Sequence, residues 1–226
     1  MDSPLDFLFF TCVIALLLLP LGWAQQSSTP PGSSSSAHAR RPAPAPDSSL
    51  DAGLVSNGIY RNRELGFTCK IPAGWVLRTE EMNEGDDGQR DQAVSKSGRV
   101  LLAAFSRPPA ARGQEVNSSI LIAAESAAEY PGLKEAAQYF GPVTEIAKAQ
   151  GFAVAEEPYE FAVGAKTLVR GDFQKDVGSR VMRQSTLVIL ARGYAVSFTF
   201  IGGTEDEVEE LIAGLSFAAS AKPHPR

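Results

Sequence analysis

Carboxylates are the residues of this chain with the greatest scope for chemistry, because histidine is almost absent. The 226 residues include two histidines, His38 and His224, and two cysteines, Cys12 and Cys69. His38 lies in a Ser/Pro-rich stretch and His224 lies between two prolines near the C-terminus. Ser-His-Asp and Cys-His catalysis and histidine-based zinc, copper and iron sites need histidine within a folded domain. The sequence therefore argues against these chemistries.

The densest acidic run, residues 83–91, superficially has the composition of a calcium loop, with oxygen ligands placed around glycines. However, a twelve-position loop that starts at Asn83 would have Gly85 at position three and Val94 at position twelve, where the bidentate Glu is required. We therefore expect a solvated loop and no bound metal. The candidate calcium ligands, if one binds, are Asp86, Asp87 and Asp91.

A second acidic group, residues 205–210, has the pattern of a helix start. Thr204 and Glu207 have the spacing of a capping box, and acidic side chains in a first helical turn complement the helix dipole. We expect a structural helix here rather than a catalytic pair of carboxylates. The apolar residues that recur at helical spacing are Val208, Leu211, Ile212 and Leu215.

A cluster of mixed charges surrounds one predicted hairpin. Exposed cross-strand pairing is one interpretation of these charges, and the polar rim of a partner site is the other. The cluster consists of Arg170, Asp172, Lys175, Asp176, Arg180 and Arg183. The residues that we single out as a candidate partner surface are Arg170, Asp172, Arg180 and Arg183.

Three short patterns carry less information. Cys69 lies in the alternating stretch 67–71, which predicts a half-buried thiol on a strand, with a reactive or intermolecular cysteine as the alternative. Asn117-Ser118-Ser119 matches the acceptor for N-glycosylation, a motif that also occurs by chance. A hydrolase built on a Ser-x-x-Lys pair is not supported, since Ser126, for instance, has no lysine at that spacing.

The segments before residue 51 predict export. Residues 1–24 combine an apolar run with small residues at the positions that a signal peptidase reads. Asp2 and Asp6 stand where a signal peptide usually carries positive charge, so a membrane anchor formed by residues 5–22 is the alternative. Residues 25–50 are rich in Ser, Pro and Ala and predict a disordered linker. We expect an exported protein, periplasmic or extracellular, that contacts membrane only through an uncleaved leader.

Residues 51–226 predict one globular domain with a short flexible tail from about residue 219. The chain has 21 Lys and Arg against 26 Asp and Glu, a formal net charge of −5, and no long basic run. This balance argues against nucleic acid as a partner.

The pattern within the domain predicts an α+β fold with a largely antiparallel sheet and helices packed on its faces. The spacing of residues 133–147 predicts a kinked helix or two short ones, because Gly141-Pro142 interrupts it. Gly164 and Arg192-Gly193 are connections short enough for hairpins. Apolar runs and alternation predict strands at 100–105, 120–124, 152–155, 159–163, 166–173, 181–191 and 194–201.

A family resemblance is carried by Gly66-Phe67, Pro72 and Trp75. We expect a strand to enter the core at Gly66-Phe67 and to end at Pro72, and we expect Trp75 to pack back against the core. This spacing resembles the opening of PsbP-like proteins, named for an extrinsic subunit of the oxygen-evolving complex. Residues 60–62 and Leu65 are similar to secreted bacterial members. The resemblance implies an α/β/α sandwich over roughly residues 58–218. It implies no catalytic residues, and the linker does not resemble the segment that docks the plant subunit.

These observations favour a non-catalytic, exported binding or scaffold module that docks on an envelope or membrane-associated protein complex. The alternative is a carrier of a small ligand or metal ion, which would use the cleft between the sheet and the terminal helix. A hydrolase using Asp/Glu or a Ser/Lys pair is a third hypothesis. We expect no cofactor and a protein of the cell envelope as partner.

Overall fold

The computed structural model describes residues 50–87, 98–108 and 116–218, except for the side chains of residues 84–87. The predicted leader, all but the last residue of the predicted linker and the predicted tail lie outside the described residues. Within the described ranges, no helix is both long enough and apolar enough to cross a membrane.

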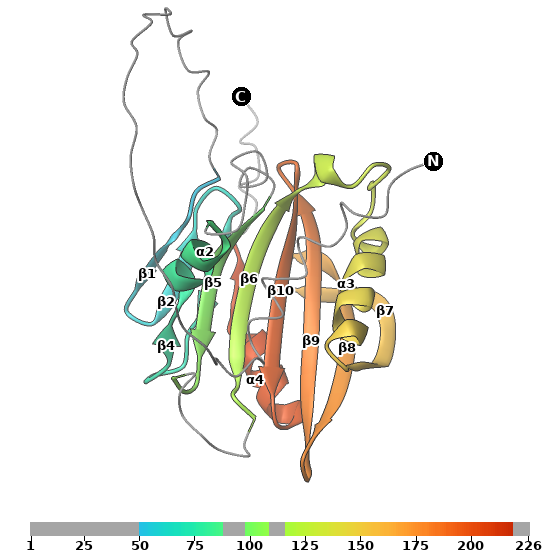
Figure 1. The fold of residues 1–226 in the computed structure, drawn as a ribbon. Coiled ribbons are helices and arrows are strands. Elements are labelled where there is room, and N and C mark those ends of the chain that lie inside the picture. Colours follow the sequence, from blue (N-terminus) through green and yellow to red (C-terminus); the bar gives the residue numbers. More distant parts are fainter. Residues whose placement is uncertain (1–49, 88–97, 109–115, 219–226) are drawn as a thin grey trace, which may run out of the picture.

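The main element is a seven-stranded antiparallel sheet with the order β4-β5-β6-β10-β9-β8-β7 (Figure 1). The predicted hairpins are present, and Arg192 and Gly193 join β9 to β10 with positive φ angles of 51° and 81°, which match the twist of the flanking strands. The strands are β4 (Val76–Leu77), β5 (Gly98–Phe105), β6 (Ser119–Ser126), β7 (Ala153–Val163), β8 (Lys166–Val177), β9 (Arg180–Ala191) and β10 (Tyr194–Gly202).

A smaller four-stranded sheet, with the order β1-β2-β3-β11, contributes to the cover on one face of the large sheet together with helix α4 (Glu205–Ala213). The strand expected at residues 67–71 is β3 of this sheet, whereas the other three strands and the sheet itself were not predicted. β1, β2 and β11 have only three or four residues each, too few for a clear alternation of apolar and polar residues. The strands are β1 (Leu54–Ser56), β2 (Ile59–Asn62), β3 (Phe67–Lys70) and β11 (Leu215–Phe217).

Helices cover the opposite face of the large sheet. Met82 of α2 (Thr79–Asp87) packs in a cluster with β5 and β6, and Phe140 of α3 (Phe140–Ala149) packs in a cluster with β8, β9 and β10. The short 3-10 helices η2 (Ala127–Glu129) and η3 (Ala136–Tyr139) lead from β6 to α3. The predicted class, an α+β fold with a largely antiparallel sheet and helices on its faces, is confirmed.

Two local predictions need correction, and a third is met in part. Residues 83–87 are the second half of α2 and not a loop. Two short helices, η3 and α3, are present as one alternative expected, but Gly141-Pro142 lies in the first turn of α3 and not between them, because a proline there removes an N–H that has no partner within the helix. The strands predicted at 152–155 and 159–163 are one strand, β7, whose register shifts twice around Glu156. Pro158 is tolerated in β7 because β7 lies at the edge of the sheet.

The residues of the family motif join the two sheets. Phe67 begins β3, is 2% exposed and lies edge-on to Phe198 of β10, with 4.9 Å between the ring centroids. Gly74 has a φ of +84°, which turns the chain after Pro72. Trp75 then packs against the core as a partly buried side chain. The motif therefore has the structural role that its residues predict.

Replacing Gly171 with alanine should lower the free energy of unfolding by about 1–3 kcal/mol through overpacking. A Cβ at this position of β8 would lie 2.6 Å from Phe140 Cε1, where α3 begins. Urea denaturation measures the effect, and Gly141→Ala is the matched control, since nothing lies within 4 Å of a Cβ there. Equal stability of the two variants would contradict the close contact between α3 and β8.

Candidate functional site

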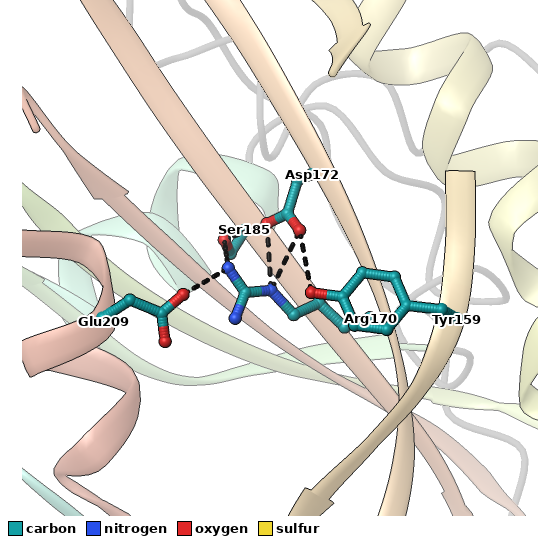
Figure 2. Close-up of polar contacts among 5 residues, drawn as sticks. All are labelled: Tyr159, Arg170, Asp172, Ser185 and Glu209. Atoms are coloured by element: carbon teal, nitrogen blue, oxygen red, sulfur yellow. Dashed lines mark hydrogen bonds and ion pairs between the residues drawn. The ribbon is translucent and has the colours of Figure 1, made fainter. Parts of the chain in front are cut away.

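The best-defined polar site among the described residues is centred on Arg170, in β8 (Figure 2). Its Nε donates to both carboxylate oxygens of Asp172 at 3.0 Å. Its Nη2 donates to Ser185 Oγ in β9 at 3.0 Å and forms an ion pair with Glu209 Oε1 of α4 at 2.6 Å. The Arg170 side chain is 8% exposed. A nearly buried cation thus links two strands to the terminal helix.

Aromatic residues of β7 complete this site. The Arg170 guanidinium carbon lies 5.0 Å from the ring centroid of Phe161 and 5.9 Å from that of Tyr159. Tyr159 Oη donates to Asp172 Oδ2 at 3.2 Å. Burial first, and then the negative charge of Asp172, raise the pKa of Tyr159 to about 12. Tyr159 is therefore a neutral donor at physiological pH.

The charges of the site are balanced against one another. Burial would lower the pKa of the Arg170 guanidinium, but its hydrogen bonds and charge interactions with Glu209 and Asp172 outweigh burial and raise it. The Ser185 hydroxyl donates a hydrogen bond to Asp172, a carboxylate that also accepts hydrogen bonds from Arg170 and Tyr159. The arrangement suits holding α4 on the sheet and presenting fixed side chains at its rim.

The structure divides the predicted partner residues into two groups. Arg170 and Asp172 lie together inside the site, where Arg170 is buried and not exposed as the cross-strand interpretation expected. Arg183 is half-buried and lies two residues before Ser185 on β9, so its side chain is on the same face of the sheet as that of Ser185. Arg180 is exposed at the start of β9. The other two charges of the cluster lie apart, since Lys175 donates to the backbone oxygen of Gln150 and Asp176 is exposed.

The candidate calcium ligands cannot be placed in a site. Asp91 and the side chains of Asp86 and Asp87 lie outside the described residues. Within the described part of the chain, no group of three or more His, Cys, Asp or Glu side chains is arranged to hold a metal ion.

Cys69 of β3 is fully buried rather than half-buried, and burial raises the pKa of its thiol to about 12. Since the thiolate is the reactive form, we expect iodoacetamide at pH 8 to modify Cys69 of the native protein at least about a hundredfold more slowly than in the unfolded protein. Peptide mass spectrometry distinguishes Cys69 from Cys12. Comparable rates for Cys69 in the two states would show that the thiol is accessible.

The sequence did not indicate Glu209, Ser185 or Tyr159 as members of the site. Glu209 was assigned to an acidic helix start, and Thr204 does cap α4 by accepting from the backbone N–H of Glu207. The other half of the predicted capping box is missing. The Glu207 carboxylate accepts from the backbone N–H of Gly203, whereas a capping box requires it to accept from the backbone N–H of Thr204. The alternation of side chains along β8 and β9 could have predicted that Ser185 lies on the same face of the sheet as Arg170. It could not have predicted the contact of Arg170 with α4.

A second buried polar cluster lies on the other face of the sheet. The hydroxyls of Tyr130 and Tyr139 both donate to the carboxylate of Glu125, which is 4% exposed. Burial, with the charge of Glu125, raises the pKa of both tyrosines above the ordinary value. Their rings pack edge-to-face at 5.1 Å. The cluster fixes the connection between β6 and α3.

Comparison with known proteins gives similarity in structure alone. No family model and no curated protein matches the chain. Similar solved structures include cyanobacterial PsbP (CyanoP) from Synechocystis, at 14% identity over 77% of this chain and 100% of that chain with a TM-score of 0.42. The Ran-binding protein Mog1p of Saccharomyces cerevisiae is similar at 14% identity over 67% of this chain and 90% of that chain, with a TM-score of 0.37. LpqN of Mycobacterium tuberculosis, involved in cell envelope biogenesis, is similar at 12% identity over 68% of this chain and 83% of that chain, with a TM-score of 0.34.

The structures to which this chain is similar thus include members of the PsbP/Mog1-like fold. At these identities and TM-scores the similarity concerns the fold, and no residue, ligand or activity is transferred from it.

Proposed function

We propose that this domain is a non-catalytic binding and scaffold module that is exported and docks on an envelope or membrane-associated protein complex. The observation that carries the proposal is the Arg170 site, which fixes side chains from β7, β8, β9 and α4 on one face of the domain. A surface that is already ordered loses little conformational entropy when a partner binds.

The residues at the rim of this site suit a protein partner. Tyrosine and arginine are enriched among the residues that dominate binding energy at protein interfaces. Tyr159 is half-buried, its hydroxyl is held by Asp172, and Glu209 of α4 is 45% exposed. Arg183 extends the same face along β9. The surface thus combines an aromatic anchor with fixed charges of both signs.

The proposal is tested by site-specific photo-crosslinking in intact cells that produce the protein with an affinity tag at Arg226. A crosslinker at position 183 should capture one stoichiometric envelope protein, and Glu209→Lys should abolish the capture from that position. A crosslinker at Arg61, which is exposed on β2 of the small sheet, is the matched control. Recovery of the monomer alone, or of the same proteins from both positions, would argue against docking through this face.

The alternative function, a carrier with its site between the sheet and the terminal helix, receives less support at that location. Val208, Leu211 and Ile212 of α4 are all buried in the core cluster that also contains Leu187 and Phe198 of the sheet. The apolar face of α4 therefore packs directly against the sheet. A cavity of about 60 Å³ lies instead on the opposite face of the large sheet, lined by residues that include Phe152, Met182 and Ile201.

A further inference from the structure

The small sheet exposes two large aliphatic side chains on its outer side. Leu54 of β1 is 70% exposed and Ile59 of β2 is 40% exposed, and they are two of the three exposed large hydrophobic residues that the structure describes. Leu54 pairs with Arg61, two residues from Ile59 along β2, so the two aliphatic side chains are diagonal neighbours on one face. Single exposed hydrophobic residues are ordinary, whereas neighbouring ones form a patch that can contact a protein or a membrane.

Strand pairing shows which side chains share this face. One row of paired residues crosses all four strands of the small sheet, and a second row crosses β1, β2 and β3. Alternate residues, such as Tyr60 and Cys69, point the other way and are buried in the core. The outward residues, which we call the small-sheet face, are Leu54, Arg61, Thr68 and Ser216 in the first row and Ser56, Ile59 and Lys70 in the second.

The charges of the small-sheet face are all positive. Arg61 and Lys70 are both exposed, and no Asp or Glu is among the residues of the two rows. Neither cation forms an ion pair with another described residue. The chain as a whole has a formal net charge of −5, so this face is positive within an acidic protein. Charge complementarity therefore favours an anionic partner.

The residue types of this face suit a lipid surface better than a protein. Lys is depleted at protein interfaces, and Leu, Ser and Thr are under-represented among the residues that dominate binding there. The aromatic side chains of the small sheet, Tyr60, Phe67 and Phe217, belong to the core cluster or pack against it. Binding to a membrane surface strengthens with buried apolar area and with Lys and Arg near anionic headgroups, and this face offers both.

The chain enters the domain beside the small sheet. Leu50 is 8% exposed and belongs to the core cluster. The backbone N–H of Asp51 donates to Glu64 Oε2 at 2.9 Å, and the Asp51 backbone oxygen accepts from Asn62 Nδ2, at the end of β2, at 2.8 Å. A membrane anchor formed by residues 5–22, the alternative expectation for the leader, would therefore be joined to the domain next to the small sheet.

We propose that the small-sheet face binds the surface of an anionic phospholipid membrane. Leu54 and Ile59 insert among the headgroups, and Arg61 and Lys70 pair with lipid phosphates. From the sequence, membrane contact was expected only through an uncleaved leader, whereas this contact is made by the folded domain itself. The face shares no residue with the Arg170 site, so it does not depend on the protein partner proposed for that site.

The test is photo-crosslinking of the full chain on vesicles of phosphatidylcholine with about 30% phosphatidylglycerol. A photo-reactive residue at Ser56, within the small-sheet face, should give phospholipid adducts that peptide mass spectrometry detects. The same residue at Ala149, exposed in α3 on the opposite face of the large sheet, is the matched control and should give almost none. Both positions belong to the same chain, so a leader that holds the protein on the vesicle acts equally on both.

Charge neutralisation tests the role of the two cations. Arg61→Gln combined with Lys70→Gln should lower the adduct yield at position 56 at least about fivefold, because each cation near an anionic surface strengthens binding by about that factor. Lys134→Gln combined with Lys166→Gln removes the same charge from exposed positions elsewhere and should change the yield less than about twofold.

A separate variant tests the apolar contact. Leu54→Ser should lower the adduct yield at position 56 about fivefold, because less apolar surface is then removed from water. Leu54, Arg61 and Lys70 are all exposed, so their variants should fold as the native protein does, and urea denaturation verifies this.

Equal adduct yields at positions 56 and 149 would overturn the proposal, because lipid contact would then come from the leader alone. An equally high yield at position 56 on pure phosphatidylcholine would also overturn it, since the positive charges would then be irrelevant. Capture of a protein and no lipid from position 56 in intact cells would assign the face to an acidic protein and would overturn the lipid contact as well.

Discussion

Replacing Arg170 with methionine should lower the free energy of unfolding by about 3–5 kcal/mol, since removal of one partner leaves a buried charge uncompensated. Asp172, whose side chain is 17% exposed, would lose the guanidinium that binds both of its oxygens. α4 would lose its ion pair with the sheet. Urea denaturation of the purified protein measures the change, and hydrogen exchange should locate the lost protection in α4.

Two matched variants separate the possible causes. Arg170→Lys keeps the charge but loses the planar group that contacts three partners, so it should recover only part of the stability. Glu209→Gln should cost less than about 1 kcal/mol, because the Glu209 side chain is 45% exposed and solvent screens the pair. If Arg170→Met were as stable as the native protein, the Arg170 site would contribute no net stability.

Replacing Phe67 with alanine should lower the free energy of unfolding by about 3–5 kcal/mol, as expected for loss of a fully buried aromatic side chain. Phe67 lies 4.9 Å from Phe198 of the large sheet, 5.7 Å from Tyr60 and 6.0 Å from Phe217, by ring centroids. The substitution removes the aromatic contact that joins the two sheets. Thermal or urea unfolding measures the loss.

A double-mutant cycle with Phe198→Leu tests whether this loss comes from the junction between the sheets. Residues in direct contact show coupling, so the two substitutions together should cost less than the sum of their separate effects. Ile59→Ala is the control, because Ile59 is 40% exposed on β2 of the same small sheet and should change stability far less. Strictly additive effects would indicate that Phe67 and Phe198 stabilise their sheets separately.

The longer strands of the large sheet were predictable because their signals are local, whereas the two-residue strand β4 was not predicted. β5 and β6 are largely continuous apolar runs, and β7, β8, β9 and β10 are long segments joined by short turns containing Gly164-Ala165, Gly178-Ser179 or Arg192-Gly193. The small sheet was not predictable in the same way, because β11 pairs with β3 across more than a hundred residues. Such a pairing leaves no pattern within a window of either strand.

The candidate site shows the same division. Arg170 and Asp172 were identified because they belong to a cluster of mixed charges around one predicted hairpin. Their burial was not expected, because it depends on Glu209, which belongs to a helix that follows two strands later. Acidic residues near the start of a helix are common because they complement the helix dipole. Only the packing of α4 distinguishes Glu209 from its neighbours.

The edge formed by β7 has a consequence for contact between two copies of this protein. An edge strand ordinarily offers free backbone groups to a strand of another molecule, which is a route to aggregation. In β7, Pro158 removes a donor and the two register shifts bend the strand away from a straight ladder. Glu156, Glu157 and Glu160 are exposed there, so two such edges would repel each other. The sheet is thereby protected against growth from this side, even where many copies lie close together.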